Sequence, residues 1–357
     1  MTQRLNNLRK AMRDEGLEGF LITSRQNTFY FTGFTGSTSK CLVTMEKAYL
    51  VVDFRYAIQA RQQVFQGIEV IEYEKSFNDT LNALCLDEKI SGLGIEGDDI
   101  TFSGYKSLKE SLTGVSSFRD LQNRLNEIRM IKDETEIEKI QKAVDIADRV
   151  FEYILPFLKP GVKEIDIASE MEYEMKKLGA KGPSFETIVA SGPRSALPHG
   201  VAGLRELKSG DAVVLDFGAI YEGYCSDITR TVFIGKPSEE LFKIYNIVLK
   251  AQLEAINNAR TGMTGRELDN HARNIIYGAG YEKCFGHGLG HGVGVEIHEK
   301  PSVSPRGDDI LKSGMVFSIE PGIYIEGTGG VRIEDLVLLT DEGVKVLTAA
   351  KKDLIVL

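Results

Sequence analysis

The sequence has no tryptophan, only four cysteines and only five histidines among its 357 residues. The cysteines lie far apart without a CxxC pair, so we expect reduced thiols rather than a disulfide framework. No stretch reaches the ~20 apolar residues of a membrane-spanning helix, and the N-terminus has no apolar signal segment. These absences predict a cytoplasmic protein with no membrane partner.

An excess of positive charge is also missing. The 43 Lys and Arg residues are outnumbered by 52 Asp and Glu residues, and the net charge is -9 at pH 7. Because nucleic-acid binding needs clustered Lys and Arg, we expect no nucleic-acid partner. The length suggests about two domains.

The N-terminal part alternates between helix and strand signals. Leu5, Leu8 and Met12 mark one face of a helix. Residues 19–22 and 48–52 have the pattern of short buried strands. This alternation predicts a small α/β domain.

A second segment begins near Asp133. Asp133 and Glu136 form a capping-box pattern, and apolar residues then recur at intervals of three and four, as in an amphipathic helix. We place the domain boundary within residues 121–132 and assign residues 1–122 and 123–357 to the two domains.

The C-terminal part contains an internal repeat with an offset of about 103 residues. Residues 216–223, DFGAIYEG, resemble residues 320–327, EPGIYIEG, and each copy follows a glycine and an apolar strand. A further acid, Asp227 or Glu334, follows each copy, and a helix-like stretch precedes each. The simplest account is a duplicated unit of helices and a hairpin, packed about a pseudo-twofold axis.

Four acids occupy equivalent positions in the two copies. Asp216 and Glu320 end apolar strands, and Asp227 and Glu334 follow them. A carboxylate at the end of a buried strand is costly unless it is paired or bound to a cation. No Lys or Arg stands at matching positions in both hairpins, so metal ions are the natural counter-charge.

Three of the five histidines, His287, His291 and His298, lie within the glycine-rich residues 286–299. Glycine lets the backbone run close to a site, and the alternating apolar residues at 293–297 predict a strand. His291 and His298 would point to opposite faces of a regular strand. A bulge or bend is therefore needed if both face one pocket.

These motifs resemble those of the pita-bread metallopeptidase family, which includes methionine aminopeptidase, aminopeptidase P and prolidase. The resemblance covers nearly the whole chain, because the first ~120 residues are similar to the smaller domain of the proline-directed members. It implies an α+β fold. A duplicated pseudo-twofold pita-bread catalytic domain is expected to follow a smaller α/β domain of the creatinase/prolidase type.

The family's metal ligands fall on Asp216, Asp227, His291, Glu320 and Glu334. The resemblance implies two divalent metal ions per subunit. Asp227 and Glu334 would bridge both ions, Asp216 would complete one site, and His291 and Glu320 would complete the other. An oxygen-rich set with one imidazole suits Mn²⁺ or Co²⁺, with Fe²⁺ or Zn²⁺ as alternatives.

The resemblance also implies catalytic roles. Metal ions lower the pKa of a shared water, Glu320 would take its proton, and His298 would donate to the oxyanion. The expected catalytic set is Glu320, His298 and His199, and the expected substrate-binding set is His199, His287, His298 and Arg332. Thr229 is a candidate hydrogen-bond partner for a ligand carboxylate.

Arg332 is the residue from which we predict substrate specificity. It lies two residues before Glu334, so on a strand both share one face. Arg332 could balance the charge of a metal-bound acid, or lie in the substrate region as the resemblance implies. Proline-directed members carry this arginine, whereas methionine aminopeptidases generally lack both it and the extra domain. We therefore expect substrates with proline in second position.

Three functions remain open, and we favour an Xaa-Pro aminopeptidase acting on peptides. The first alternative is an Xaa-Pro dipeptidase (prolidase), which needs a cation for the free carboxylate of proline, with Arg306 as a candidate. The second is a metal-free creatinase-like or non-catalytic binding relative, which the complete ligand set disfavours. The resemblance further implies a homodimer, in which residues 27–37 reach toward the partner's active site.

Overall fold

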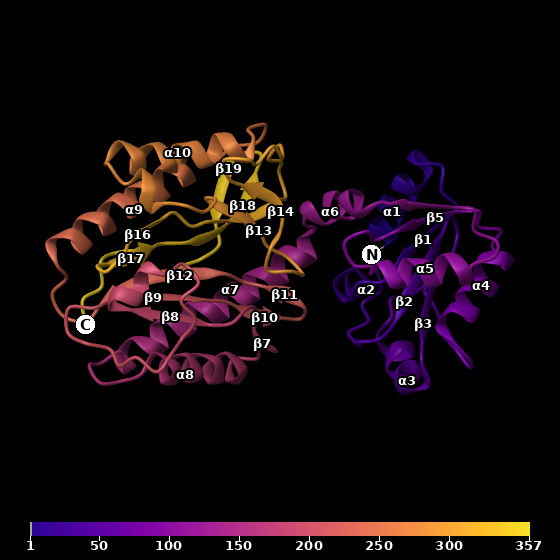
Figure 1. Ribbon diagram of the computed structural model, residues 1–357, viewed down its shortest axis with the longest axis horizontal. Helices are drawn as coiled ribbons and strands as arrows, with labels where there is room; N and C mark the ends of the chain where they lie inside the picture. The colour runs from indigo at the N-terminus through magenta and orange to yellow at the C-terminus, as the bar shows by residue number, and fades with distance from the viewer. Residues whose placement is uncertain (1) are drawn as a thin grey trace. The chain divides into compact units, whose positions relative to one another are not determined.

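The computed structural model describes residues 2–357, and the chain divides into two compact units, Met1–Arg129 and Met130–Leu357 (Figure 1). The first unit is built on a six-stranded mixed sheet with the strand order β4-β3-β2-β1-β5-β6. Its strands are β1 (Gly19–Ile22), β2 (Lys40–Thr44), β3 (Ala48–Val52), β4 (Glu69–Glu72), β5 (Gly92–Ile95) and β6 (Ser117–Asp120). The two strands expected from the sequence, β1 and β3, are confirmed.

Helices precede, connect and follow these strands along the chain. They are α1 (Thr2–Asp14), α2 (Arg25–Thr32), α3 (Phe54–Gln63), α4 (Phe77–Asp87), α5 (Phe102–Ser111) and α6 (Gln122–Met130). Leu5, Leu8 and Met12 form the buried face of α1, as predicted. Because β1 pairs in parallel with β5 and antiparallel with β2, the unit is a mixed α/β domain. The domain ranges 1–122 and 123–357 remain predictions.

The second unit consists of two similar halves. Its helices are α7 (Glu134–Ile154), α8 (Glu164–Lys177), α9 (Glu239–Asn258) and α10 (Gly265–Gly278). In Figure 1 the strands of this unit lie between α8 on one side and α9 with α10 on the other. The predicted capping box starts α7, because Asp133 accepts from the Glu136 N–H at 2.9 Å and Glu136 accepts from the Asp133 N–H at 3.1 Å.

Each half contributes antiparallel strands to the centre of the unit. The first half supplies β7 (Gly182–Pro183), β8 (Ile188–Ser191), β9 (Ala212–Phe217), β10 (Ala219–Tyr221), β11 (Tyr224–Cys225) and β12 (Ile228–Phe233). The second supplies β13 (Gly290–Gly292), β14 (Glu299–Val303), β15 (Val316–Ile319), β16 (Gly322–Ile325), β17 (Gly329–Arg332), β18 (Asp335–Thr340) and β19 (Gly343–Val346). The repeated segments form equivalent elements, α8 with α10 and β9–β10 with β15–β16. The predicted duplication is confirmed.

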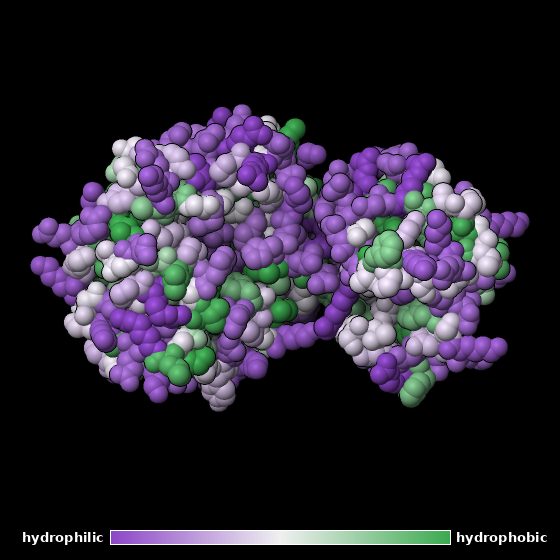
Figure 2. Space-filling view, in the orientation of Figure 1, coloured by the Kyte–Doolittle hydropathy of each residue, from purple (hydrophilic) through white to green (hydrophobic). Residues whose placement is uncertain are grey.

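Apolar side chains form a separate core cluster around each helix pair. One cluster joins α7 and α8 to β9 and β12, and the other joins α9 and α10 to β15 and β18. Figure 2 shows hydrophilic side chains over most of the visible surface. Among residues 2–357, no helix combines the length and the apolar composition that crossing a membrane requires.

Candidate metal centre and active site

Two short breaks between strands carry the acids Asp227 and Glu334. Asp227 lies between β11 and β12, and Glu334 occupies the equivalent place between β17 and β18. Asp216 lies within β9 opposite Thr229 of β12, and Glu320 follows directly after β15. Since strands of the two halves meet through the hydrogen bond from the Glu334 N–H to the Thr229 carbonyl, the four acids converge.

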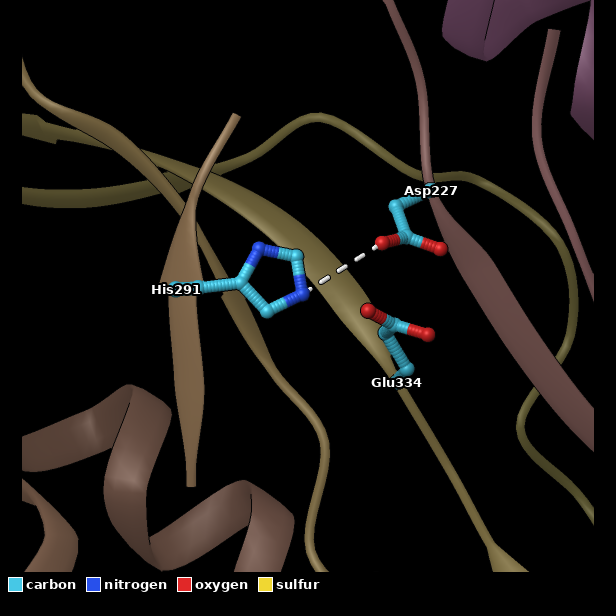
Figure 3. A group of neighbouring side chains, drawn as sticks. All are labelled: Asp227, His291 and Glu334. Carbon is cyan, nitrogen blue, oxygen red and sulfur yellow. Dashed lines mark ion pairs between the residues drawn. The ribbon is translucent and has the colours of Figure 1, made fainter. Parts of the chain in front are cut away.

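Figure 3 shows Asp227 and Glu334 pointing toward the imidazole of His291. Each of these three residues offers a ligand atom, and the three atoms all lie within 4.8 Å of one another. The Nε2 atom of His291 is 3.6 Å from an Asp227 oxygen and 3.2 Å from a Glu320 oxygen. This spacing is compatible with one cation bound between them.

The strand that carries His291 needs glycine on both sides. A Cβ atom at Gly290 would overlap the Ser318 backbone, and one at Gly292 would overlap the Lys300 backbone. The pairing of β13 with β14 changes register between His291 and Gly292. His291 donates from Nδ1 to the Gly292 carbonyl at 3.1 Å, which leaves Nε2 directed at the acids.

The predicted strand over residues 293–297 is wrong. Residues 294–298 form a series of bends between β13 and β14. The Cys225 N–H donates to the Gly294 carbonyl at 2.8 Å, so tertiary hydrogen bonding overrides the alternating apolar pattern. The bends place the His298 ring 4.3 Å from the His291 ring, which confirms the bend that a shared pocket requires.

Two carboxylate oxygens in the site are buried without a hydrogen-bond partner among the described residues, Asp227 Oδ1 and Glu334 Oε1. Burial, with repulsion from Glu334 and Asp216, raises the pKa of Asp227 well above its usual range. Burial, with repulsion from Glu320 and Asp216, does the same to the pKa of Glu334. A divalent cation held by these acids would offset their repulsion and satisfy buried carboxylate oxygens, so these residues fit a metal centre.

Glu320 is held in its charged form. Burial opposes its ionisation, but the hydrogen bond and charge of His291 outweigh burial and lower the pKa of Glu320 to about 2. A carboxylate beside an imidazole suits a metal ligand.

The guanidinium of Arg332 binds to residues in and beside the candidate metal centre. It pairs with Asp216, donates from Nε to the Thr229 hydroxyl at 3.1 Å, and donates to the Pro198 carbonyl at 3.2 Å. Thr229 in turn donates to Glu334 Oε2 at 2.7 Å, so its predicted hydrogen bond to a ligand carboxylate is confirmed. Arg332 therefore balances the charge of a buried acid, which is one of the two roles proposed for it.

Tyr324 is a site residue that the sequence did not reveal. Its hydroxyl accepts from Arg332 at 2.7 Å and lies 2.9 Å from His287 Nε2. His287 Nδ1 faces the Gly288 carbonyl at 2.7 Å and must donate there, so the Tyr324 hydroxyl donates to Nε2. Burial lowers the pKa of His287 and favours this neutral tautomer. The repeat aligns Tyr324 with Ile220, and its pattern gives no sign of this hydrogen-bond chain.

A cavity of about 450 Å³ lies over these residues. It is lined by all the predicted ligands and substrate-binding residues, Asp216, Asp227, His291, Glu320, Glu334, His199, His287, His298 and Arg332. Their individual roles remain predictions. Apolar side chains that the sequence did not single out complete the lining, among them Phe185, Ile188 and Val201. Arg306 is exposed and does not line the cavity, so nothing in this unit supports it as a carboxylate partner.

Comparison with known proteins decides the family. Residues 138–341 match the model of metallopeptidase family M24. The chain belongs to this family. Residues 4–131 match the creatinase/prolidase N-terminal domain. The expected family, the two-part fold and the assignment as a metallopeptidase are therefore confirmed.

Similar M24 proteins align over nearly their full length. A solved Xaa-Pro dipeptidase from Bacillus anthracis is 44% identical with a TM-score of 0.97, covering 100% of this chain and 99% of that one. An X-Pro aminopeptidase from Thermotoga maritima is 42% identical with a TM-score of 0.90, covering 96% and 98%. A curated Xaa-Pro dipeptidase from Pyrococcus furiosus is 41% identical over 356 residues, which are 99% of this chain and 100% of that protein.

We expect a chelator to lower the thermal unfolding midpoint and Mn²⁺ to raise it again. An ion that binds only the folded state stabilises it by about 2.7 kcal/mol when its free concentration is 100 times Kd. Differential scanning calorimetry with EDTA, followed by Mn²⁺ titration, measures the shift. A monovalent salt at equal ionic strength is the control for charge screening. An unchanged midpoint with every divalent ion would contradict a metal centre.

Proposed function

We propose that this M24 metallopeptidase hydrolyses Xaa-Pro bonds and acts as an Xaa-Pro dipeptidase. The observation that carries the proposal is the cavity in which four acids and His291 meet, with two buried carboxylate oxygens that lack a protein partner. The similar proteins named above supply the substrate class. Two of the three are Xaa-Pro dipeptidases, and the third is an X-Pro aminopeptidase.

Asp216, Asp227, His291, Glu320 and Glu334 would hold the two metal ions. When bound, the ions polarise the scissile carbonyl and lower the pKa of a water nucleophile. Glu320 is the proposed proton acceptor, because it is a carboxylate that faces the same cavity. His298 is the donor to the oxygen of the scissile carbonyl. The oxygen-rich ligand set favours Mn²⁺ or Co²⁺, with Fe²⁺ or Zn²⁺ as alternatives.

The substrate's proline ring needs an apolar wall beside the reacting carbonyl. Phe185, Ile188 and Ile297 line the cavity together with Pro198 and Val201. Burying the apolar surface of the proline ring against this wall favours binding by roughly 25 cal/mol per Å². His199 and His287 line the same cavity and are the polar groups proposed to orient the peptide.

The aminopeptidase remains the second candidate, and we rank it below the dipeptidase because two of the three named relatives are dipeptidases. The sequence alone favoured cleavage of longer peptides, whereas the named relatives favour dipeptides. One relative that is 42% identical is an X-Pro aminopeptidase, and this relative supports the second candidate.

A homodimer is also proposed. Light scattering after gel filtration measures the molar mass of the particle in solution.

We expect the Mn²⁺-loaded protein to cleave Ala-Pro at least ~10-fold faster, in kcat/KM, than Ala-Pro-Ala, because a tenfold preference needs only about 1.4 kcal/mol of selective binding. Release of free alanine measures both reactions, and Met-Ala-Ala is the control for proline dependence. Equal or faster cleavage of Ala-Pro-Ala would make the protein an aminopeptidase. Cleavage of Met-Ala-Ala alone would overturn the proline-directed assignment.

A further inference from the structure

Behind the metal centre lies a buried ion pair that lines no part of the cavity, Arg230 and Asp335. Arg230 lies on β12 and is 1% exposed, and Asp335 begins β18 and is fully buried. Their side chains are 2.8 Å apart. Each residue is close in sequence to a predicted metal ligand, since Asp335 follows Glu334 directly and Arg230 is three residues after Asp227.

Arg230 links β12 to the strand break that carries Glu334. Its Nη1 atom donates to the carbonyl of Glu334 and, at 2.9 Å, to the carbonyl of Thr229. Its Nη2 atom donates to Asp335 Oδ1. One guanidinium therefore fixes the backbone of Glu334, the next side chain and the strand that bears the Thr229 hydroxyl.

Residues 348–352, near the C-terminus, form further hydrogen bonds with this ion pair. Arg230 donates to the carbonyls of Ala350 at 2.7 Å and Lys351 at 3.1 Å. Asp335 accepts from the Thr348 hydroxyl at 2.7 Å and from Lys352 at 2.5 Å. Two cations surround one buried acid, and although burial opposes it, Arg230 and Lys352 lower the pKa of Asp335.

Such an arrangement costs more to bury than an apolar packing of the same volume. Buried, fully satisfied polar networks fix a single geometry for the groups that they contact. Glu334 lies outside the regular strands, so its carboxylate depends on neighbours for its position. Residues that hold metal ligands in place change metal affinity when they are replaced, commonly by 10–100-fold.

We propose that Arg230 and Asp335, locked by residues 348–352, are positioning residues that set the place of Glu334 in the metal centre. Residues 348–352 thus support the geometry of that centre, although none of them is a predicted ligand. This inference rests on the proposed metal centre and not on the choice of substrate.

The test compares Asp335→Asn with Asp211→Asn. Asp211 forms a partly buried ion pair, with Arg205 at 2.6 Å, and contacts no predicted ligand. Mn²⁺ binding to each folded, chelator-treated variant is measured by calorimetry well below its unfolding midpoint. We expect Kd to rise at least about 10-fold in Asp335→Asn and to stay within about twofold in Asp211→Asn.

Thr348→Val extends the test if Asp335→Asn does not fold. It removes one hydrogen bond to Asp335 with almost no change in shape, and we expect Kd to rise by about 2–5-fold, which corresponds to about 0.4–1 kcal/mol. Wild-type Mn²⁺ affinity in folded Asp335→Asn, or in Thr348→Val if only that variant folds, would overturn the positioning role. Absence of Mn²⁺ binding in the wild-type protein would instead overturn the metal centre itself, and the two failures are thereby distinguished.

Discussion

Asp227→Asn is expected to abolish peptidase activity while leaving the chelated protein equally or more stable. Asn keeps the shape of the side chain but removes its charge, so the proposed metal ligand is lost. The loss of activity should exceed the roughly 100-fold that replacement of an outer hydrogen-bond partner costs. The measurements are kcat/KM for Ala-Pro and the metal content of the purified variant.

The stability part of this prediction follows from burial. Burial and repulsion from Glu334 and Asp216 raise the pKa of Asp227, which means that its charged form destabilises the fold without a cation. Removing that charge should stabilise the chelated protein by about 1 kcal/mol, or about 2–4 °C in the unfolding midpoint of the second unit, Met130–Leu357. Glu138→Gln on the exposed side of α7 is the matched control, with the same loss of charge and no expected effect. A chelated Asp227→Asn protein that unfolds at a lower temperature would contradict the account.

Arg332→Met is expected to have the opposite effect on stability. Arg332 is 3% exposed and pairs with Asp216, so its loss leaves a buried carboxylate without a cation. Breaking one partner of a buried ion pair costs about 3–5 kcal/mol. In excess Mn²⁺ the loss should be smaller, because a bound ion neutralises Asp216. Chemical denaturation with EDTA and with Mn²⁺ measures both values.

A double-mutant cycle separates this role from substrate binding. Arg332→Met together with Asp216→Asn removes both charges and should recover most of the lost stability in EDTA. Arg332→Lys is the conservative control, since it keeps the charge but cannot contact Asp216, Thr229 and Tyr324 together. If Arg332→Met raises only KM for Ala-Pro and leaves the chelated protein as stable as wild type, the arginine serves the substrate alone.

The two halves of the second unit use their repeated helix starts in unequal ways. Glu164, at the start of α8, accepts from the Ser191 N–H at 2.8 Å and from Arg194, and so anchors the loop that leads to His199. Asp269 of α10 pairs with Arg273 and accepts from the Leu289 N–H at 3.0 Å. In the repeat, Glu164 aligns with Glu267 and not with Asp269. The acid that anchors a loop therefore occupies different positions on the two equivalent helices.

The sequence by itself determined the family, the duplicated fold, and the four acids and one imidazole that converge in the cavity. It could do so because these features are local: a strand period, a capping box, a repeat offset and a set of residue types. The strand expected over residues 293–297 does not form. The Cys225 N–H, which is distant in sequence, donates to the Gly294 carbonyl, and the segment bends there.

Tertiary structure alone decided the partners of the buried polar groups. The chain from Arg332 through Tyr324 to His287, and the cluster of Arg230 and Asp335 with residues 348–352, join positions that are far apart in sequence. No periodicity records such pairings, because a hydrogen bond depends on distance and direction in space. Local patterns thus specified which groups the protein carries, and packing of the two halves specified which of them hold one another in place.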